Sequence, residues 1–270
     1  MLMDSTEDPP PKGPFEVEAN FAGRQFIGCR EHQEDYYAFS NITSEKGPAI
    51  TKLLVALGDG LGAHIGGQVA SSFLINEFVK TFKASTLSTA WRLRVSLETA
   101  NENLYTLSSK FSWSEAPMGS TFIGLVVTTQ ALHWVSVGDS PLFLFRKEAL
   151  TRLNDDHSLG PLLDERAKRG EITLEESRNH PERHILQSAC MGMPLTLVDA
   201  RMDPFPLESG DIIIASSDGI FTLTHNEIEA LLLNWQHTSA GKIIENLIFS
   251  IRCVDSPIQD NVTITVVKIP

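Results

Sequence analysis

The amino-acid sequence predicts an α+β domain in which two packed antiparallel β-sheets are flanked by helices on both outer faces, an α-β-β-α sandwich. Two observations indicate this class. Short apolar runs follow one another closely between residues 119 and 153, so tight turns rather than helical crossovers must join them. Helical patterns occur in two pairs, one before and one after this block. A doubly wound α/β sheet is the alternative, and the close spacing of the strands disfavours it.

The first quarter of the chain is expected to form strands around a charged loop. Residues 1–18 are rich in proline and charge and predict a flexible tail, so that a single domain covers residues 19–270. A strand pair is predicted for Phe21–Cys29 and Tyr36–Phe39, which flank a polar hexamer. A buried strand follows at Leu53–Leu57, where five apolar residues run together.

Four amphipathic helices are indicated by apolar residues three and four positions apart. They cover residues 70–82, 93–107, 225–232 and 240–251. The third begins with Thr224-His225-Asn226-Glu227, a capping box in which threonine and glutamate side chains satisfy backbone N–H groups at the helix start. The short heptad of the second helix is more typical of core packing than of a seam between two chains, which favours a monomer.

The strands of the second half are short. An antiparallel meander is predicted for four runs, at Thr121–Thr128, Leu132–Val137, Leu142–Phe145 and Ala149–Leu153. Two later strands are expected at Asp211–Ala215 and Val262–Val266. Residues 158–184, which follow the meander, are crowded with charged side chains and predict a surface flap that is helical in part.

Composition restricts the partners and the compartment. The 270 residues include 22 basic and 34 acidic side chains, and the net charge of −12 disfavours nucleic acid and anionic membranes while it suits cations or basic protein segments. The three cysteines form no zinc or disulfide pattern. With no signal-peptide pattern and no apolar segment long enough to span a bilayer, a cytoplasmic location is expected.

Aspartates stand at the ends of four predicted strands. Asp59, Asp139 and Asp218 each follow an apolar run, and Asp260 precedes the last one. For each of them taken singly, capping of a turn is the alternative role. Four carboxylates gathered at one end of a sandwich would repel one another without a counter-ion, and no run of Lys or Arg lies beside them. All-oxygen ligands favour Mg²⁺ or Mn²⁺, and two such ions that share one carboxylate could activate a water molecule for attack on phosphorus.

These and further motifs give the chain its resemblance to a known family. It resembles the metal-dependent protein serine/threonine phosphatases, the PPM or protein phosphatase 2C family, and in particular their compact bacterial members. The resemblance covers nearly the whole chain from about residue 23. The matching motifs, in the family's order, are Arg30-x-x-x-Glu34-Asp35, Asp59-Gly60-x-Gly62-x-His64, Met118-Gly119-Ser120-Thr121, Gly138-Asp139-Ser140, Asp156-His157-Ser158, Gly170-Glu171-Ile172-Thr173, Asn179-His180-Pro181, Ser217-Asp218-Gly219 and Asp260-Asn261.

The resemblance implies a ligand set for a centre of two Mg²⁺ or Mn²⁺ ions. Asp59 would bridge the two ions, and the Gly60 carbonyl would bind one of them, since a glycine lets the ion approach without a Cβ in the way. Asp218 and Asp260 would bind the other ion. Asp139 matches the acid that holds a third ion in bacterial members of the family.

The resemblance also implies roles for residues around these ligands. Glu34 and Asp35 would act through water or contact the ligand residues rather than the ions. Arg30 matches the family's phosphate-binding arginine, because a planar guanidinium can grip two phosphate oxygens; a surface ion pair with a nearby glutamate is the alternative. Leu61 occupies the place of a histidine that protonates the leaving group in many eukaryotic members. His64 is then a possible general acid, with a structural role in the turn as the alternative.

The implied function is that of a metal-dependent phosphatase that hydrolyses phosphoserine and phosphothreonine in proteins and opposes a serine/threonine kinase. No cysteine stands in a Cys-x5-Arg loop, so a covalent thiol mechanism has no nucleophile. Two alternatives stay open, namely a non-catalytic phosphoprotein-binding regulator of the same fold and a phosphoesterase for small phosphates. The flap would lie beside the site and shape the choice of substrate.

Overall fold

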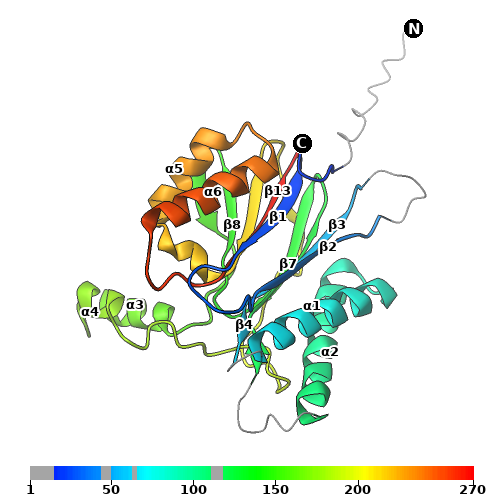
Figure 1. The fold of residues 1–270 in the computed structure, drawn as a ribbon. Helices are drawn as coiled ribbons and strands as arrows, with labels where there is room; N and C mark the ends of the chain where they lie inside the picture. The colour runs from blue at the N-terminus through cyan, green and yellow to red at the C-terminus, as the bar shows by residue number, and fades with distance from the viewer. Residues whose placement is uncertain (1–14, 44–49, 63–65, 111–117) are drawn as a thin grey trace.

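Two antiparallel sheets pack face to face, and a pair of helices covers the outer face of each (Figure 1). The computed structural model describes residues 15–43, 50–62, 66–110 and 118–270. Both sheets are built from antiparallel pairs of the named strands. The predicted α-β-β-α sandwich is therefore confirmed, and the doubly wound alternative is wrong.

One sheet has five strands and carries the two most apolar late strands at its centre. Its order is β1 (Phe21–Phe26), β13 (Val262–Lys268), β12 (Ile212–Ser216), β8 (Leu142–Arg146) and β9 (Ala149–Arg152). Its outer face is covered by α5 (His225–Trp235) and α6 (Ala240–Val254). Every residue of β12 is buried, because one face of the strand meets these helices and the other meets the second sheet.

The other sheet has six strands and supplies the opposite half of the sandwich. Its order is β10 (Asp199–Ala200), β7 (Ala131–Val137), β6 (Phe122–Val127), β3 (Leu53–Gly58) and β2 (Tyr36–Asn41), with β11 (Phe205–Pro206) also paired to β7. Helices α1 (Gly66–Ala84) and α2 (Thr89–Lys110) cover its outer face. A small ribbon of β4 (Gly60–Leu61) and β5 (Gly119–Ser120) lies at its end.

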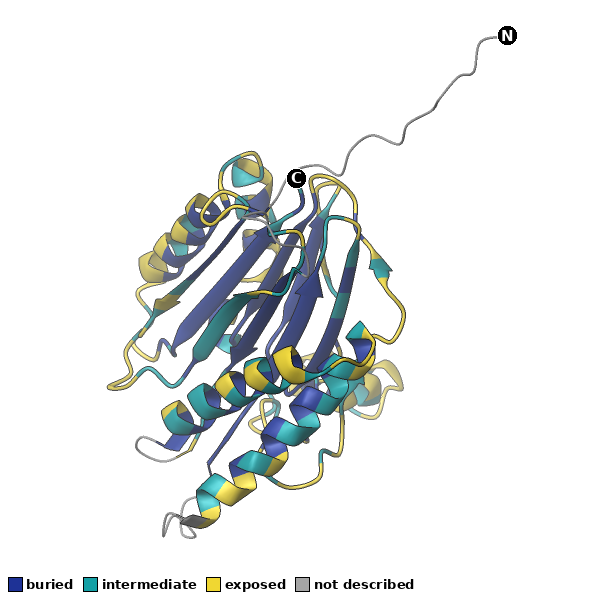
Figure 2. Ribbon diagram, turned by 90° about the vertical axis from the view of Figure 1, so that its right-hand side faces the viewer, coloured by how far each residue is buried: buried dark blue, intermediate teal, exposed yellow. Residues whose placement is uncertain are grey.

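Alternation along the strands produces three apolar layers. Val55 of β3 packs between the sheets with Ile213 of β12, whereas the next residue in each strand, Ala56 or Ile214, packs against the helices outside. Figure 2 shows the resulting buried strands between partly exposed helices. Because both faces of the central strands are apolar, their ends have a fixed position, which matters for the residues that follow them.

The flap predicted at residues 158–184 contains two short helices, α3 (Gly160–Lys168) and α4 (Leu174–Arg178). A capping box at Thr173 and Glu176 begins α4. The capping box predicted for the later helix is also present, since Thr224 and Glu227 satisfy each other's backbone N–H groups at the start of α5. None of the described helices combines the length and the apolarity needed to cross a membrane.

Two predictions of strand pairing are wrong. β1 and β2 do not pair with each other: β1 pairs with β13, and β2 pairs with β3 in the opposite sheet. The predicted meander also divides, because β6 and β7 pair in one sheet whereas β8 and β9 pair in the other. The chain crosses between sheets at the turn after Gly138, whose φ is +100°. Turn residues of this kind occur in hairpins and crossovers alike, so the sequence does not distinguish them.

Part of the segment predicted to be a flexible tail, residues 1–18, belongs to the folded core. Phe15, inside the segment expected to be flexible, has only 2% of its surface exposed and joins the apolar layer between the sheets. Its N–H donates to the Ile50 carbonyl at 2.8 Å. A phenylalanine can bury enough apolar surface to offset the entropy of ordering a few residues. Residues 1–14 lie outside the described residues.

We expect Phe15→Ala to lower the free energy of unfolding by about 3 kcal/mol, because it leaves a cavity between the sheets. Urea denaturation would measure this loss. Val17→Ala is the matched control, since Val17 is 64% exposed and should change stability by less than about 0.5 kcal/mol. Equal stability of the two variants would show that the segment does not contribute to the core.

Candidate functional site

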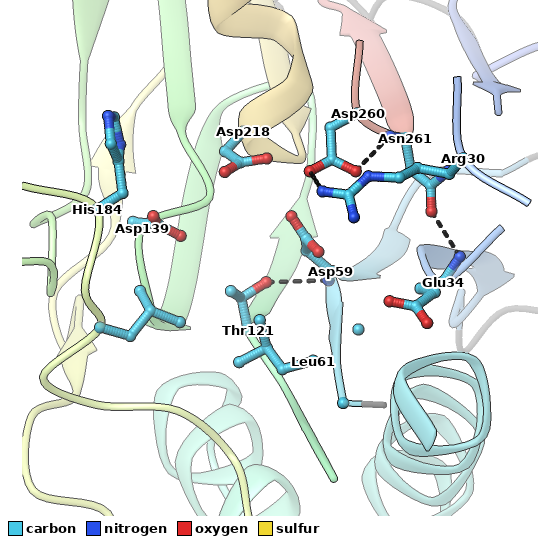
Figure 3. Close-up of a pocket in the computed structure, with 13 residues that line it drawn as sticks. Arg30, Glu34, Asp59, Leu61, Thr121, Asp139, His184, Asp218, Asp260 and Asn261 are labelled. Carbon is cyan, nitrogen blue, oxygen red and sulfur yellow. Dashed lines mark hydrogen bonds and ion pairs between the residues drawn. The ribbon is translucent and has the colours of Figure 1, made fainter. Parts of the chain in front are cut away.

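A cavity of about 300 Å³ opens where the ends of both sheets meet. It is lined by all but two of the residues selected from the sequence, namely Arg30, Glu34, Asp59, Gly60, Asp139, Asp218 and Asp260. Figure 3 shows the aspartate side chains directed into the same space. Asp35 lies buried behind the cavity, and His64 lies outside the described residues, so its role as general acid stays a prediction.

Each sheet contributes two of the aspartates. Asp59 follows β3 and Asp139 follows β7 in the six-stranded sheet, whereas Asp218 follows β12 and Asp260 precedes β13 in the five-stranded sheet. Antiparallel neighbours such as β12 and β13 bring the end of one strand beside the beginning of the other. The gathering of four acids from distant parts of the chain is therefore a result of strand topology.

The turn at Asp59 is held closely by its neighbours. The Asp59 N–H donates to the Thr121 hydroxyl at 3.0 Å, and the Thr121 N–H donates to the Asp59 carbonyl at 2.9 Å. A Cβ at Gly60 would lie 2.3 Å from the Gly67 carbonyl oxygen and 2.4 Å from that of Glu34. Only glycine fits here, because backbone atoms on both sides cannot give way.

Arg30 and Asp260 form an ion pair at the rim. A guanidinium nitrogen of Arg30 lies 2.6 Å from an Asp260 oxygen, and the Arg30 side chain is 59% exposed. The other Asp260 oxygen accepts from the Asn261 N–H at 2.7 Å. This carboxylate raises the pKa of Arg30 through the hydrogen bond and its charge. The alternative of a surface pair with a glutamate is wrong for this conformation, since the partner is an aspartate of the cavity.

Asn261 binds the loop between β1 and β2 at three points. Its side-chain oxygen accepts from the Glu34 N–H at 2.7 Å, and its side-chain nitrogen donates to the carbonyls of Ile27 at 2.8 Å and His32 at 3.0 Å. The loop that carries Arg30 is thereby tied to the start of β13. An amide with both donor and acceptor used in this way orients the loop strongly.

Asp35 is the most deeply buried acid of the group, with 3% of its surface exposed. One carboxylate oxygen accepts from the Ser217 hydroxyl at 2.7 Å, whereas the other has no hydrogen-bond partner among the described residues. Burial raises the pKa of Asp35 to about 7, and the Ser217 hydrogen bond opposes that rise. A buried, half-satisfied carboxylate next to the cavity is suited to accept a hydrogen bond from a water molecule or to face a cation.

The carboxylates that face the cavity are also destabilised in their charged form. Burial, reinforced by the charges of Asp35 and Asp218, raises the pKa of Asp59 well above its usual range. Burial, followed by the charge of Asp218, raises the pKa of Asp139 to about 7. The pKa of Asp218 is raised by burial and then by Asp260. These acids therefore favour either protons or a nearby positive charge.

The chemistry of the ligand atoms fits a hard divalent cation, whereas their positions do not by themselves outline a site for a single ion. Among the residues described, no three histidine, cysteine, aspartate or glutamate side chains converge as they would on a single ion. One of the four aspartates, Asp260, is turned to Arg30 instead. Carboxylate and carbonyl oxygens without cysteine or histidine suit Mg²⁺ or Mn²⁺. The mutual repulsion of these acids is what such an ion would relieve.

Sequence reasoning assigned no role to several residues that line the cavity. Thr121 and Asn261 belong to recognised motifs, but their hydrogen bonds to the acidic loops depend on tertiary contacts. His184, at the end of the flap, and Leu186 line the cavity as well. The flap prediction brought His184 near the site, but no local pattern distinguished it from other charged residues of that segment.

The fold and the cavity together define a class of proteins, namely α-β-β-α sandwich domains with acidic residues of both sheets in one cavity. A family model described as protein phosphatase 2C matches residues 23–246. The chain therefore belongs to the protein phosphatase 2C family, and the resemblance inferred from the sequence is confirmed.

Individual relatives agree with this membership. The serine/threonine phosphatase stp of Listeria monocytogenes serovar 1/2a is 30% identical over 186 residues, which cover 66% of this chain and 71% of the relative. A serine/threonine phosphatase of S. agalactiae has a similar fold, with a TM-score of 0.78 at 24% identity, over 93% of this chain and 99% of that one. The catalytic domain of the phosphatase PstP in complex with 2 manganese ions gives a TM-score of 0.71 at 24% identity, over 92% and 96%.

We expect the metal-free protein to lose stability as the pH rises from about 4 to 7. The pKa values of Asp35 and Asp139 are about 7 in the folded chain, against about 3.9 for an unfolded aspartate. Between these values the folded chain keeps protons that the unfolded chain has lost, so each rise in pH favours the unfolded chain. The penalty is complete above about pH 7, where the folded chain has lost these protons too.

Thermal unfolding in a chelating buffer, at several values of pH, would measure this loss. Asp139→Asn removes one of the charges and should recover about 1 kcal/mol at the alkaline end, an amount limited by the opening of the cavity to water. Added Mn²⁺ should also reduce the loss, because the cation replaces the protons. If parent and variant lost stability with pH to the same extent, the raised pKa of Asp139 would not be a cause of that loss.

Proposed function

We propose that the chain is a metal-dependent phosphatase that hydrolyses phosphoserine and phosphothreonine in proteins. The observation that carries this proposal is the gathering of buried carboxylates from both sheets around one cavity with an exposed arginine at its rim. The family to which the chain belongs and the names of its relatives agree with it. Basic protein segments suit the net charge of −12.

Two Mg²⁺ or Mn²⁺ ions are proposed as cofactors, with a third as an addition. Asp59 and the Gly60 carbonyl would hold one ion, Asp59, Asp218 and Asp260 the other, and Asp139 would take part in the third site. When bound, such ions lower the pKa of a water molecule and offset the charge of a phosphate. Glu34 and Asp35 are proposed to act through water, since Asp35 has one carboxylate oxygen without a described partner.

The protein side chains then bind and orient the phosphate ester. Arg30 is proposed to grip two phosphate oxygens, because its guanidinium is exposed at the rim and is planar. In the absence of substrate the same group holds Asp260 at 2.6 Å. Substrate binding would therefore exchange a carboxylate for a phosphate at this arginine.

The biological setting is also part of the proposal. A serine/threonine kinase would supply the phosphorylated substrates, and the chain would act as a monomer. Cys29, Cys190 and Cys253 are free thiols, which fits a reducing compartment such as the cytoplasm.

We expect Asp59→Asn to lower kcat by roughly 10³-fold, because it removes the proposed bridging carboxylate. Phosphate release from a phosphothreonine peptide and from a small aryl phosphate, each with Mn²⁺ and with a chelator, would measure this. Turnover that persists in the chelator, or a variant as active as the parent, would contradict the mechanism. Bound metal without any turnover would favour the phosphoprotein-binding regulator, and preference for the aryl phosphate would favour the small phosphoesterase.

Arg30→Lys should lower kcat/KM for the peptide roughly 10- to 100-fold, since a lysine cannot contact two phosphate oxygens in one plane. Arg24→Lys is a matched control, because Arg24 pairs with Glu18 and does not line the cavity. Steady-state kinetics of both variants would test the assignment. Equal activity of Arg30→Lys and the parent would place phosphate binding elsewhere.

A further inference from the structure

His184 is the only histidine, among those that the structure describes, that lines the catalytic cavity. In Figure 3 it lies on the Asp139 side of the cavity, on the other side of the carboxylates from Arg30. Its side chain is exposed, and no hydrogen bond or ion pair of the ring occurs with any described residue. The ring is thus free to contact a molecule bound in the cavity.

The backbone around His184 is held firmly although its ring is free. The Leu159 N–H donates to the Ile185 carbonyl at 2.9 Å, and the Gln187 N–H donates to the His157 carbonyl at 2.7 Å. An isolated antiparallel bridge also joins Leu186 to Ser158. The segment therefore runs beside the chain that leaves β9, and it cannot swing away without the loss of several backbone hydrogen bonds.

Arg183 ties the same segment to both helices of the flap. Its two terminal nitrogens donate to the two Asp164 oxygens of α3, each at 2.8 Å. Asp164 also accepts from the Ser177 hydroxyl of α4 at 2.7 Å. This two-point ion pair is of the strong, geometrically defined kind. It gives the residue that follows, His184, a defined place over the cavity.

The reaction needs a proton donor that the acidic ligands do not supply. When the bond between phosphorus and a seryl or threonyl oxygen breaks, that oxygen would leave as a strongly basic alkoxide unless it receives a proton. Leu61, which also lines the cavity, has no proton to donate. An imidazole is suited to the role in general, because it can carry and release a proton in the physiological pH range. The charge of His184 also lowers the pKa of Asp218.

We propose that His184 contacts the leaving oxygen of the phosphorylated side chain and donates a proton to it. This inference rests on the proposed phosphatase function. Water adds to phosphorus and releases a proton to solvent, the bond from phosphorus to the seryl or threonyl oxygen breaks, and that oxygen departs as the alcohol with the proton of His184. The imidazole recovers a proton from solvent before the next turnover. Substrate phosphate is then held at Arg30, and the leaving group lies toward the flap.

The dependence on the leaving group tests this proposal. We expect His184→Gln to lower kcat roughly 100-fold for a phosphothreonine peptide, less for phenyl phosphate and very little for 4-nitrophenyl phosphate, whose leaving group is acidic enough to depart without a proton. His180→Gln is the matched control, because His180 lies in the same flap but lines a different cavity. It should leave all three rates unchanged.

Several outcomes would overturn the proposal. An equal loss for all three substrates would assign His184 to binding or structure alone. A selective loss in His64→Gln or His32→Gln, with none in His184→Gln, would assign the proton to another histidine. Mn²⁺ affinity measured by calorimetry, with thermal unfolding of His184→Gln and His184→Asn, shows whether the site is intact. Absence of turnover by the parent with every substrate would instead refute the proposed function itself, and this inference with it.

Discussion

Repulsion among the carboxylates at one end of the sandwich is the constraint on which the rest of the structure depends. Asp59 and Asp218 come from different sheets, yet they share one cavity, and burial raises the pKa of both. In an unfolded chain these charges would separate in water. They are brought together because each follows a strand whose residues are buried on both faces, so the apolar layers set the position of the acids.

The unfavourable cluster is held by polar residues that support the backbone rather than neutralise the charge. Thr121 fixes the turn at Asp59, Ser217 binds Asp35, and Asn261 ties the loop of Arg30 to the last strand. Gly60 allows two backbone segments to approach closely beside that turn. The remaining negative charge is suited to a cation, which would relieve the repulsion among the acids.

Around this rigid floor, two loops bring the groups that would contact the substrate. Arg30 lies at the rim of the cavity beside Asp260, and His184, at the end of the flap, lines the opposite side of the cavity. The two ends of the flap are joined by backbone hydrogen bonds between residues 157–159 and 185–187, and the ion pair of Arg183 with Asp164 supports the flap from within. Selectivity and proton transfer can thus vary with the flap, while the acidic floor is constrained by the core.

The sequence by itself determined the sandwich class, the presence of the four long helices and the four aspartates at strand ends, because hydrophobic periodicity and the position of a residue after a strand are local properties. Only the tertiary structure decided that β1 and β2 lie in different sheets, that the chain crosses between sheets after Gly138, that Phe15 packs in the core and that His184 lines the same cavity as Asp218. These features depend on which distant segments meet, and a turn residue does not encode the direction that the chain takes beyond it.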